Sequence, residues 1–244
     1  MPISAWFEHC LVLTYSFPEE ALRPLLPPGL AVDTWNGSGF VAIAMVQTKN
    51  LRPSGLPPSL GCDFFLTGYR IFSRYKTLEG RTLRGLRILR SDTDSWRMVL
   101  GGNLLTHYHY RKCSARVEQQ NGSLLVQVET RDREADVIVE ADIQAEADLP
   151  EGSIFSNWSE ARRFAGPLPF TFDFEKETNS IVRIKGIRQD WNPRAVRVNI
   201  RKASFVESPM FGGKVGKLAS AFYAAKLPYR WERGIVERLK KDGA

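Results

Sequence analysis

A period-two alternation of apolar and polar residues dominates the chain. The clearest example is the segment 132–148, where acids occupy even positions and apolar residues, among them Val137, Val139 and Ile143, occupy odd ones. A strict period of two indicates an extended strand with one face in water and the other buried. We therefore expect a long antiparallel strand here, or a slightly broken pair, whose acids face solvent and take no part in catalysis.

Similar patterns predict many other strands. The dipeptide Asn121-Gly122 between two of them is typical of a tight hairpin turn. The predicted strands cover residues 11–15, 39–47, 68–76, 84–89, 114–119, 124–130, 180–186 and 195–201. So many short extended segments indicate one large antiparallel sheet.

Helices are expected to be few and short. Pro18 and the acids Glu19 and Glu20 favour a helix start, because proline suits the first turn and acids suit its positive end. A second helix is expected over 96–105, with Asp94 or Ser95 as its N-cap. A third is predicted over 214–226 from an apolar stripe at helical spacing, formed by Leu218, Ala221, Phe222 and Ala225.

The composition is that of a globular protein, with 244 residues of which 43% are hydrophobic. No linker or repeat divides the chain, so we predict a single domain over residues 1–244. The longest apolar run, 40–46, is too short to span a bilayer, which needs roughly 20 residues. The N-terminus lacks the features of a secretory signal, which favours a cytoplasmic location. The three cysteines are widely spaced and predict free thiols.

The net charge of +7 is unevenly distributed. Residues 129–151 hold nine acids and two arginines, whereas residues 181–244 hold fifteen basic residues and five acids. A basic C-terminal third could bind nucleic acid or another partner through phosphate contacts. The basic residues alternate with apolar ones, as on a solvated sheet face that could also pair with the acidic strand, so nucleic-acid binding is disfavoured.

The segment 107–113 is the most chemically dense part of the chain, reading His-Tyr-His-Tyr-Arg-Lys-Cys. On a strand, Tyr108, Tyr110 and Lys112 would share one face, and the two histidines and Arg111 the other. If the first set faces a cavity, it offers phenol and ammonium donors to an anionic or carbonyl ligand. Otherwise the tyrosines only fill the core. The histidines would need a third ligand such as His9 to hold a metal, so no metal site is predicted.

Five segments have a distinctive sequence and order: Tyr15–Asp33, Gly68–Phe72, Gly85–Asp94, the helix before 107–110, and Phe155–Phe172. Together they resemble an uncharacterised domain family related to acetoacetate decarboxylase. The resemblance covers most of the chain, from about residue 8 to 205. It implies a mainly β (α+β) fold, a curled antiparallel β-barrel or cone with a few short peripheral helices and a ligand cavity inside.

The sequence departs from the decarboxylase at the reacting groups. That enzyme uses a lysine as a Schiff-base nucleophile, activated by a neighbouring lysine. Aligning its motif on Tyr108 puts Tyr110 at the nucleophile's position and Lys112 one residue beyond the pair. Near 64–67, where the enzyme carries a glutamate, the nearest acid is Asp63. The iminium mechanism is therefore disfavoured.

Arg70 is the best interior arginine, because it lies in an otherwise aromatic strand where a charge needs a partner. Arg84, Arg87 and Arg90 form a second basic group that we expect to be mostly exposed. The ligand-binding candidates are Arg70, Tyr108, Tyr110 and Arg111, and the candidates for an acid or base are Tyr110 and Lys112.

Three functions stay open. We favour a protein that binds a small carboxylate or carbonyl compound in its cavity without a cofactor. The alternatives are an enzyme that acts on a small keto acid without a Schiff base, and a nucleic-acid or partner-binding protein that uses the basic C-terminal third. Whether the chain is an enzyme at all and whether it forms a homo-oligomer are left open, because fold alone does not determine function.

Overall fold

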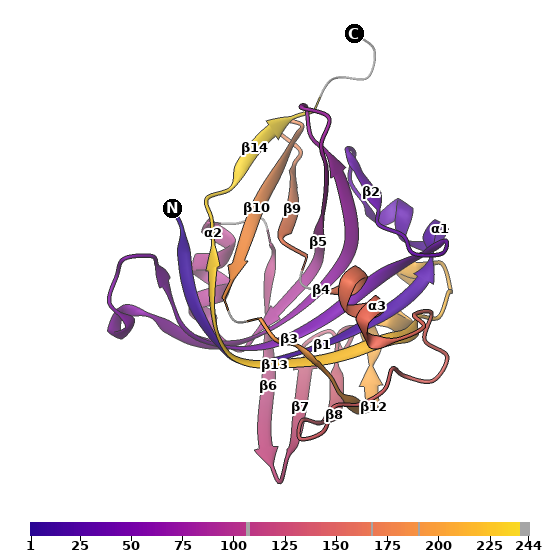
Figure 1. The fold of residues 1–244 in the computed structure, drawn as a ribbon. Coiled ribbons are helices and arrows are strands. Elements are labelled where there is room, and N and C mark those ends of the chain that lie inside the picture. Colours follow the sequence, from indigo (N-terminus) through magenta and orange to yellow (C-terminus); the bar gives the residue numbers. More distant parts are fainter. Residues whose placement is uncertain (106–107, 167, 190, 240–244) are drawn as a thin grey trace.

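The computed structural model describes residues 1–105, 108–166, 168–189 and 191–239, whose strands form one large curled sheet (Figure 1). The strands are β1 (Ile3–Pro18), β2 (Leu30–Val32), β3 (Ser38–Pro53), β4 (Cys62–Lys76), β5 (Thr82–Thr93), β6 (Tyr110–Gln120), β7 (Ser123–Thr130), β8 (Val137–Asp142), β9 (Phe170–Glu175), β10 (Ser180–Arg188), β11 (Arg194–Ala195), β12 (Arg197–Ala203), β13 (Lys217–Trp231) and β14 (Ile235–Arg238). The helices are α1 (Glu19–Leu22), α2 (Asn103–Leu105) and α3 (Trp158–Ala165), with a π-helical turn at Met98–Gly102 and 3-10 turns at Arg23–Leu25, Pro58–Leu60, Ser204–Glu207 and Pro209–Phe211. The mainly β fold with a few short helices is confirmed.

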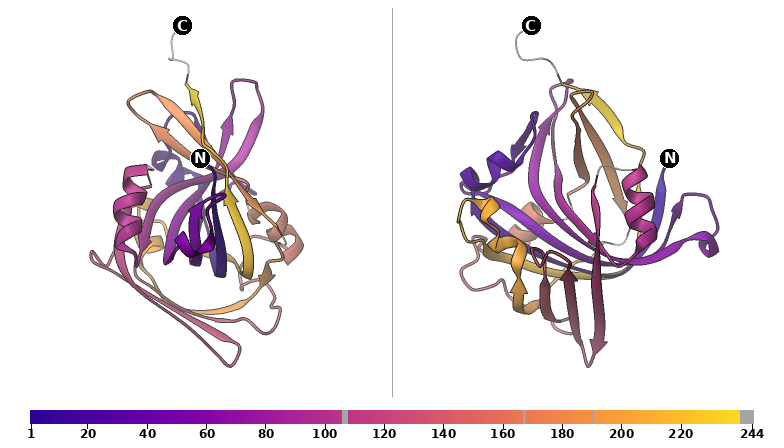
Figure 2. Two further views of the ribbon diagram at one scale, coloured as in Figure 1. Left: turned by 90° about the vertical axis from the view of Figure 1, so that its left-hand side faces the viewer. Right: turned by 180° about the vertical axis from the view of Figure 1, so that it is seen from behind.

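Part of the sheet closes on itself. β4 pairs with β5, β5 with β9, and β9 with β10. β13 joins β10 to β1, and β3 joins β1 back to β4. In Figure 1, β9 and β10 rise above the long strands β1, β3 and β13. A second branch, β6, β7, β8 and β12, leaves β5 and extends on the other side of these long strands (Figure 2). The closed ring of strands encloses the space in which the candidate site lies.

The long strands separate two apolar cores, which explains their nearly continuous apolar runs. Leu11 and Leu13 of β1 pack in one core with residues of β7 and β8. Cys10 and Val12 face the other core, inside the ring. Alternate side chains of a strand point to opposite faces, so a strand that is buried on both faces carries no polar alternation.

The helix predicted over 214–226 is wrong. Most of this segment belongs to β13, which lies between β1 and β10 in the sheet. Ala219 to Ala224 are all buried, with Ala221 on one core and Phe222 on the other. A short apolar run of this kind fits a doubly buried strand as well as a helix, and here the sheet environment decides.

The strand predicted over 132–148 is shorter than expected. β8 covers only Val137–Asp142, and within it the odd positions are buried and the even ones are not, as predicted. Asp136 precedes the strand in a turn, is buried, and accepts a hydrogen bond from Lys202 of β12 at 2.7 Å. The predicted hairpin at 121–122 joins β6 to β7, and the first two predicted helices are present, the second with its π turn in the middle. Helix α3, capped by Asn157, was not predicted.

The arginines of β5 are held by carboxylates rather than exposed. Arg84 donates to Asp33 at 2.6 Å, and Arg87 binds Asp173. Arg90, only 6% exposed, donates to Asp92 at 2.7 Å and to Asp132 at 2.9 Å. Charges that are taken out of water need such partners. These arginines therefore tie the sheet to its flanking segments and are not available to a ligand.

We predict that Asp132→Asn changes how the free energy of unfolding depends on pH in the acidic range. The hydrogen bonds from Arg90 hold the pKa of Asp132 well below its usual range. A carboxylate with a depressed pKa stabilises the fold above its unfolded pKa, and this contribution is lost as the pH falls towards the folded value. Because Asp132 is partly exposed, we expect Asp132→Asn to cost about 1 kcal/mol at pH 7. Urea unfolding at a series of pH values should show the two proteins converging below about pH 4, whereas a constant difference would contradict this role.

Candidate functional site

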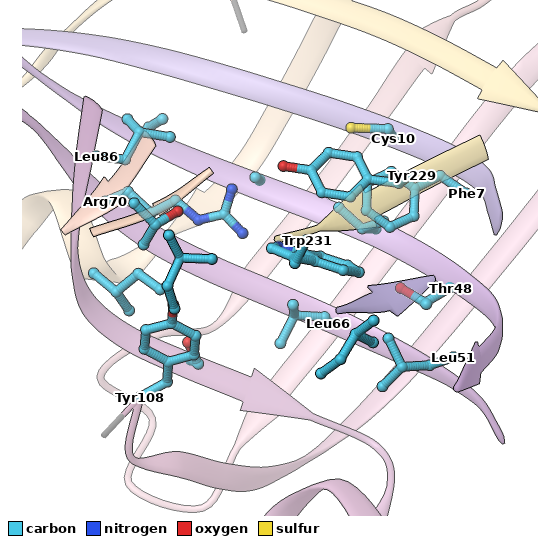
Figure 3. A pocket seen from close by; sticks show the side chains of 18 of the residues that line it. Phe7, Cys10, Thr48, Leu51, Leu66, Arg70, Leu86, Tyr108, Tyr229 and Trp231 are labelled. Atoms are coloured by element: carbon cyan, nitrogen blue, oxygen red, sulfur yellow. The ribbon is translucent and has the colours of Figure 1, made fainter. Parts of the chain in front are cut away.

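A cavity of about 490 Å³ lies inside the closed ring of strands. Its walls come from β1, β3, β4, β5, β9, β10 and β13 and from the π turn Met98–Gly102. Most lining side chains are apolar, including Phe7, Leu51, Leu66, Leu86 and Trp231 (Figure 3). A deep, mainly apolar cavity with a few polar groups is the usual form of a small-molecule site.

Arg70 of β4 is one of the charged residues that line this cavity. In Figure 3 its guanidinium points into the cavity, between Leu86 and Tyr108 on one side and Trp231 on the other. A Cβ atom placed on Gly68 would be 2.8 Å from Nε of Arg70, so the arginine side chain lies directly over this glycine. Glycine inside a strand often marks such a close approach.

Arg70 differs from the arginines of β5 in its partners. Its Nε is buried and donates to no partner among the described residues, and no carboxylate there forms an ion pair with it. A guanidinium whose buried Nε has no acceptor leaves hydrogen-bonding capacity unused, which is costly unless a ligand supplies the acceptor. The geometry suits an anion, since a guanidinium binds a carboxylate through two parallel hydrogen bonds.

Tyr108 and Tyr110 line the cavity beside Arg70. Their rings meet edge to face, with centroids 6.2 Å apart. Burial raises the pKa of Tyr110 to about 12 against the opposing effect of Arg70, and burial raises the pKa of Tyr108 further. Both phenols therefore stay protonated at neutral pH and can donate hydrogen bonds to a ligand.

The helix before this segment positions Tyr110. Asn103 accepts a hydrogen bond from the Tyr110 amide at 2.6 Å and donates one to its carbonyl oxygen at 3.0 Å. A Cβ atom on Gly102 would come within 2.5 Å of the Tyr110 ring, so the ring packs on bare backbone. The space that this tyrosine ring needs therefore explains the glycine at position 102.

Arg111 and Lys112 lie outside the cavity. Arg111 is half-exposed and pairs with Asp132 at 3.0 Å. Lys112 Nζ donates to the carbonyl oxygens of Asp94 at 2.7 Å and Cys113 at 3.1 Å. Neither is among the residues that line the cavity. The alternation of side chains along a strand predicted that Lys112 shares a face with Tyr110. The ammonium group of Lys112 instead donates to backbone carbonyl oxygens near the end of β5.

The histidines form no metal site among the described residues. His9 Nδ1 is hydrogen-bonded to the hydroxyl of Tyr223 at 2.7 Å, and burial lowers the pKa of His9. His109 is exposed with a positive φ of 50°, and His107 lies outside the described residues. Within the part of the chain that the structure describes, no group of three or more His, Cys, Asp or Glu side chains could hold a metal ion.

Other polar groups of the cavity were missed from the sequence. Tyr229 and Trp231 come from β13, and Arg188 from β10 lies over the ring of Tyr229, 5.0 Å from its centroid. Glu232 and Arg97 also line the cavity. The alternation of bulky residues at 227, 229 and 231 after the misassigned helix was the available signal.

Cys10 lies on the cavity wall as a neutral thiol. Burial raises its pKa to about 11 despite the nearby Arg70 and Arg188. A thiol in this state is a poor nucleophile at neutral pH. We therefore give Cys10 a packing role.

Solved structures with the same fold come from acetoacetate decarboxylase and similar enzymes. The decarboxylase from Legionella pneumophila superposes with a TM-score of 0.66 at 12% identity, covering 97% of this chain and 87% of that one. An acetoacetate decarboxylase-like enzyme from Sphingomonas wittichii RW1 has a TM-score of 0.62 at 12% identity, covering 97% and 93%. The enduracididine biosynthesis enzyme MppR, complexed with pyruvate, has a TM-score of 0.61 at 12% identity, covering 97% and 90%. These likenesses confirm the fold expected from the sequence segments.

Sequence comparison adds a family. The model of the DUF2071 family, described as an uncharacterized conserved protein, matches residues 4–228. Among curated proteins, none matches the chain significantly. Within the described residues, no helix is both long enough and apolar enough to cross a membrane.

Proposed function

Because this chain belongs to the DUF2071 family and has the fold of acetoacetate decarboxylase, we propose that it binds a small organic carboxylate inside its ring of strands. One observation carries the proposal. The guanidinium of Arg70 enters an apolar cavity without an acidic partner among the described residues. A carboxylate ligand would complete this ion pair, and the neutral phenols of Tyr108 and Tyr110 would donate to its remaining lone pairs or to a carbonyl oxygen.

We propose that binding involves no Schiff base. The described residues that line the cavity include no lysine. The nearest candidate in the sequence motif, Lys112, donates to two carbonyl oxygens. A lysine nucleophile must face the substrate carbonyl, and Lys112 points to these backbone oxygens instead of lining the cavity. The pyruvate complex of MppR is a property of that enzyme, and it supports only the general idea that this fold accepts a small carboxylate.

An enzyme without a Schiff base is the second candidate, favoured by the position of Tyr110. Its hydroxyl is neutral, buried and electrostatically coupled to Arg70. A phenol beside a bound carbonyl compound can act as a general acid, and a neighbouring cation eases loss of its proton. In this reading Arg70 holds the substrate carboxylate and Tyr110 donates its proton to the adjacent carbonyl oxygen.

Nucleic-acid binding finds less support. Several basic residues of the C-terminal third are paired with acids: Lys202 with Asp136, Arg201 with Glu140, and Arg183 with Glu237. The first two pairs link β12 to the acidic segment around β8, as the sequence pattern predicted. Paired charges contribute less to phosphate binding than free ones.

A thermal-shift panel tests the proposal. We expect carboxylates to raise the melting temperature by several degrees at low and high salt, because a guanidinium that points into a mainly apolar cavity is poorly screened. Nucleotides should have no effect. Borohydride reduction in the presence of acetoacetate should leave the protein mass unchanged. A salt-sensitive shift with nucleotides alone, or a reduced adduct on a lysine, would contradict the proposed mode of binding.

A further inference from the structure

The floor of the cavity is a groove along β3 and β4. Alternate residues of β4 line it on one side, running from Arg70 past Gly68 to Leu66 and Phe64. Their partners on β3 are Ala42, Ala44, Val46 and Thr48, in that order. Side chains two apart on a strand share a face, so these two rows form one continuous surface inside the ring.

The side chains along this groove change in character with distance from Arg70. Next to the arginine the floor is formed by small residues, Ala42, Ala44 and Gly68, which leave room above them. Beyond these come Val46 and Leu66, then a wall of larger apolar side chains that consists of Phe7, Leu51, Phe64 and Trp231. Arg70 and the tyrosines therefore lie at one end. In the two strand rows beyond Gly68, Thr48 is the one polar residue, and the charged residues Arg188, Glu232 and Arg97 reach the cavity from other elements.

The apolar end is the open end. Met1 lines the cavity here and is 73% exposed, and Arg97 on the other lip is also exposed. Ile3 pairs with Pro53 of β3 and with Trp231 of β13, which places this lip at the end of the groove away from Arg70. From Gly68, over which the guanidinium lies, to Phe64 is four residues of strand, or about 13 Å.

The dimensions exceed those of a short keto acid. Such a molecule would cover Arg70 and the tyrosines and leave most of the 490 Å³ unfilled. At about 30 Å³ per water, that space would hold on the order of ten waters against apolar walls, which is unfavourable. An apolar chain on the carboxylate would displace this water.

We propose that the carboxylate ligand is amphipathic, with an apolar chain of roughly eight to ten carbons or an aromatic group of similar length that fills the groove from Gly68 to Leu51. This inference rests on the proposed carboxylate site at Arg70. The carboxylate lies against Arg70 and Tyr108, at the end of the groove away from Met1, and the apolar part points to the opening between Met1 and Arg97.

Calorimetric titration of the protein with butanoate, hexanoate, octanoate, decanoate and dodecanoate tests this. Burial of each methylene should tighten binding about fourfold, until the chain reaches the opening and further carbons no longer matter. We expect the gain to level off near ten carbons. Octanol, which lacks the carboxylate, should bind at least tenfold more weakly than octanoate.

Val46→Phe provides a variant that blocks only the groove. Its ring would occupy the space opposite Leu66, so octanoate should bind at least tenfold more weakly while butanoate is unaffected. Leu66→Phe narrows the groove at the same level from the other strand and should act in the same direction. Both variants leave Arg70 in place, and their melting temperatures report whether the fold is intact.

The outcomes separate this inference from the function on which it rests. Equal binding of butanoate and octanoate, with both lost in Arg70→Met, would overturn the amphipathic ligand and leave the carboxylate site standing. Octanoate and octanol binding equally well, unaffected by Arg70→Met, would overturn the carboxylate site. Absence of binding by every member of the series would overturn both.

Discussion

Replacing Arg70 with methionine is expected to lower carboxylate affinity about 100-fold, which corresponds to about 3 kcal/mol. Methionine keeps much of the side-chain volume and removes the charge that has no acidic partner among the described residues. The same change should leave the free energy of unfolding of the ligand-free protein unchanged or raise it by up to about 2 kcal/mol, because an unpaired guanidinium in an apolar cavity is costly. Calorimetry and urea unfolding of the purified variant measure the two effects.

Two further variants show whether the effect belongs to the guanidinium. Arg74→Met removes an arginine from the same strand that is 44% exposed and pairs with Asp33 at 3.5 Å, so carboxylate binding should be unchanged. Gly68→Ala keeps Arg70 but puts a methyl group against its Nε, so the guanidinium must move and affinity should fall about tenfold. If Arg70→Met and Arg74→Met weakened binding equally, general surface charge and not the cavity would be responsible.

Replacing Arg90 with methionine is expected to destabilise the fold by about 3–5 kcal/mol. Arg90 is 6% exposed and donates to Asp92, which is fully buried. Burial raises the pKa of Asp92 even with this arginine beside it. In the absence of Arg90, the buried carboxylate of Asp92 would lose its main partner. We then expect Asp92 to take up a proton, or the sheet around it to open.

The loss in Arg90→Met should depend on pH. A carboxyl group with a raised folded-state pKa stabilises the fold at low pH, and this contribution is lost as the pH rises through that pKa. Urea unfolding should therefore show a smaller loss near pH 5 than near pH 8. The double variant Arg90→Met with Asp92→Asn should recover part of the stability at pH 8, since no charge is left unpaired there. A loss below about 1 kcal/mol in the single variant would contradict this account of the pair.

Much of the fold was predictable from the sequence because the second branch and several ring strands expose one face. The alternation in 137–142 and 124–130 marks strands with one wet face, and both are present as β8 and β7. The segment 214–226 was misassigned because β13 is buried on both sides, where alternation disappears. Helix α3 was missed because it is short and carries several polar residues.

The candidate site was predictable only in part, because some of its residues come from the misassigned strand β13. Arg70 stood out as a charge in an aromatic strand, and Tyr108 and Tyr110 followed from the family resemblance. Tyr229 and Trp231 follow the misassigned helix directly, so the alternation of bulky residues that marks them as part of a strand was overlooked. The partners of Arg84 and Arg87, Asp33 and Asp173, are more than fifty residues away in sequence and meet them only through the fold.

A crystal structure of the protein grown with 8-bromooctanoate would test the central claim most directly, because the bromine can be located by its anomalous scattering. We predict the carboxylate within about 3 Å of the Arg70 guanidinium, with the bromine near Leu51 and Trp231 at the open end of the cavity. A cavity free of this compound at saturating concentration, or a carboxylate bound away from Arg70, would contradict the account.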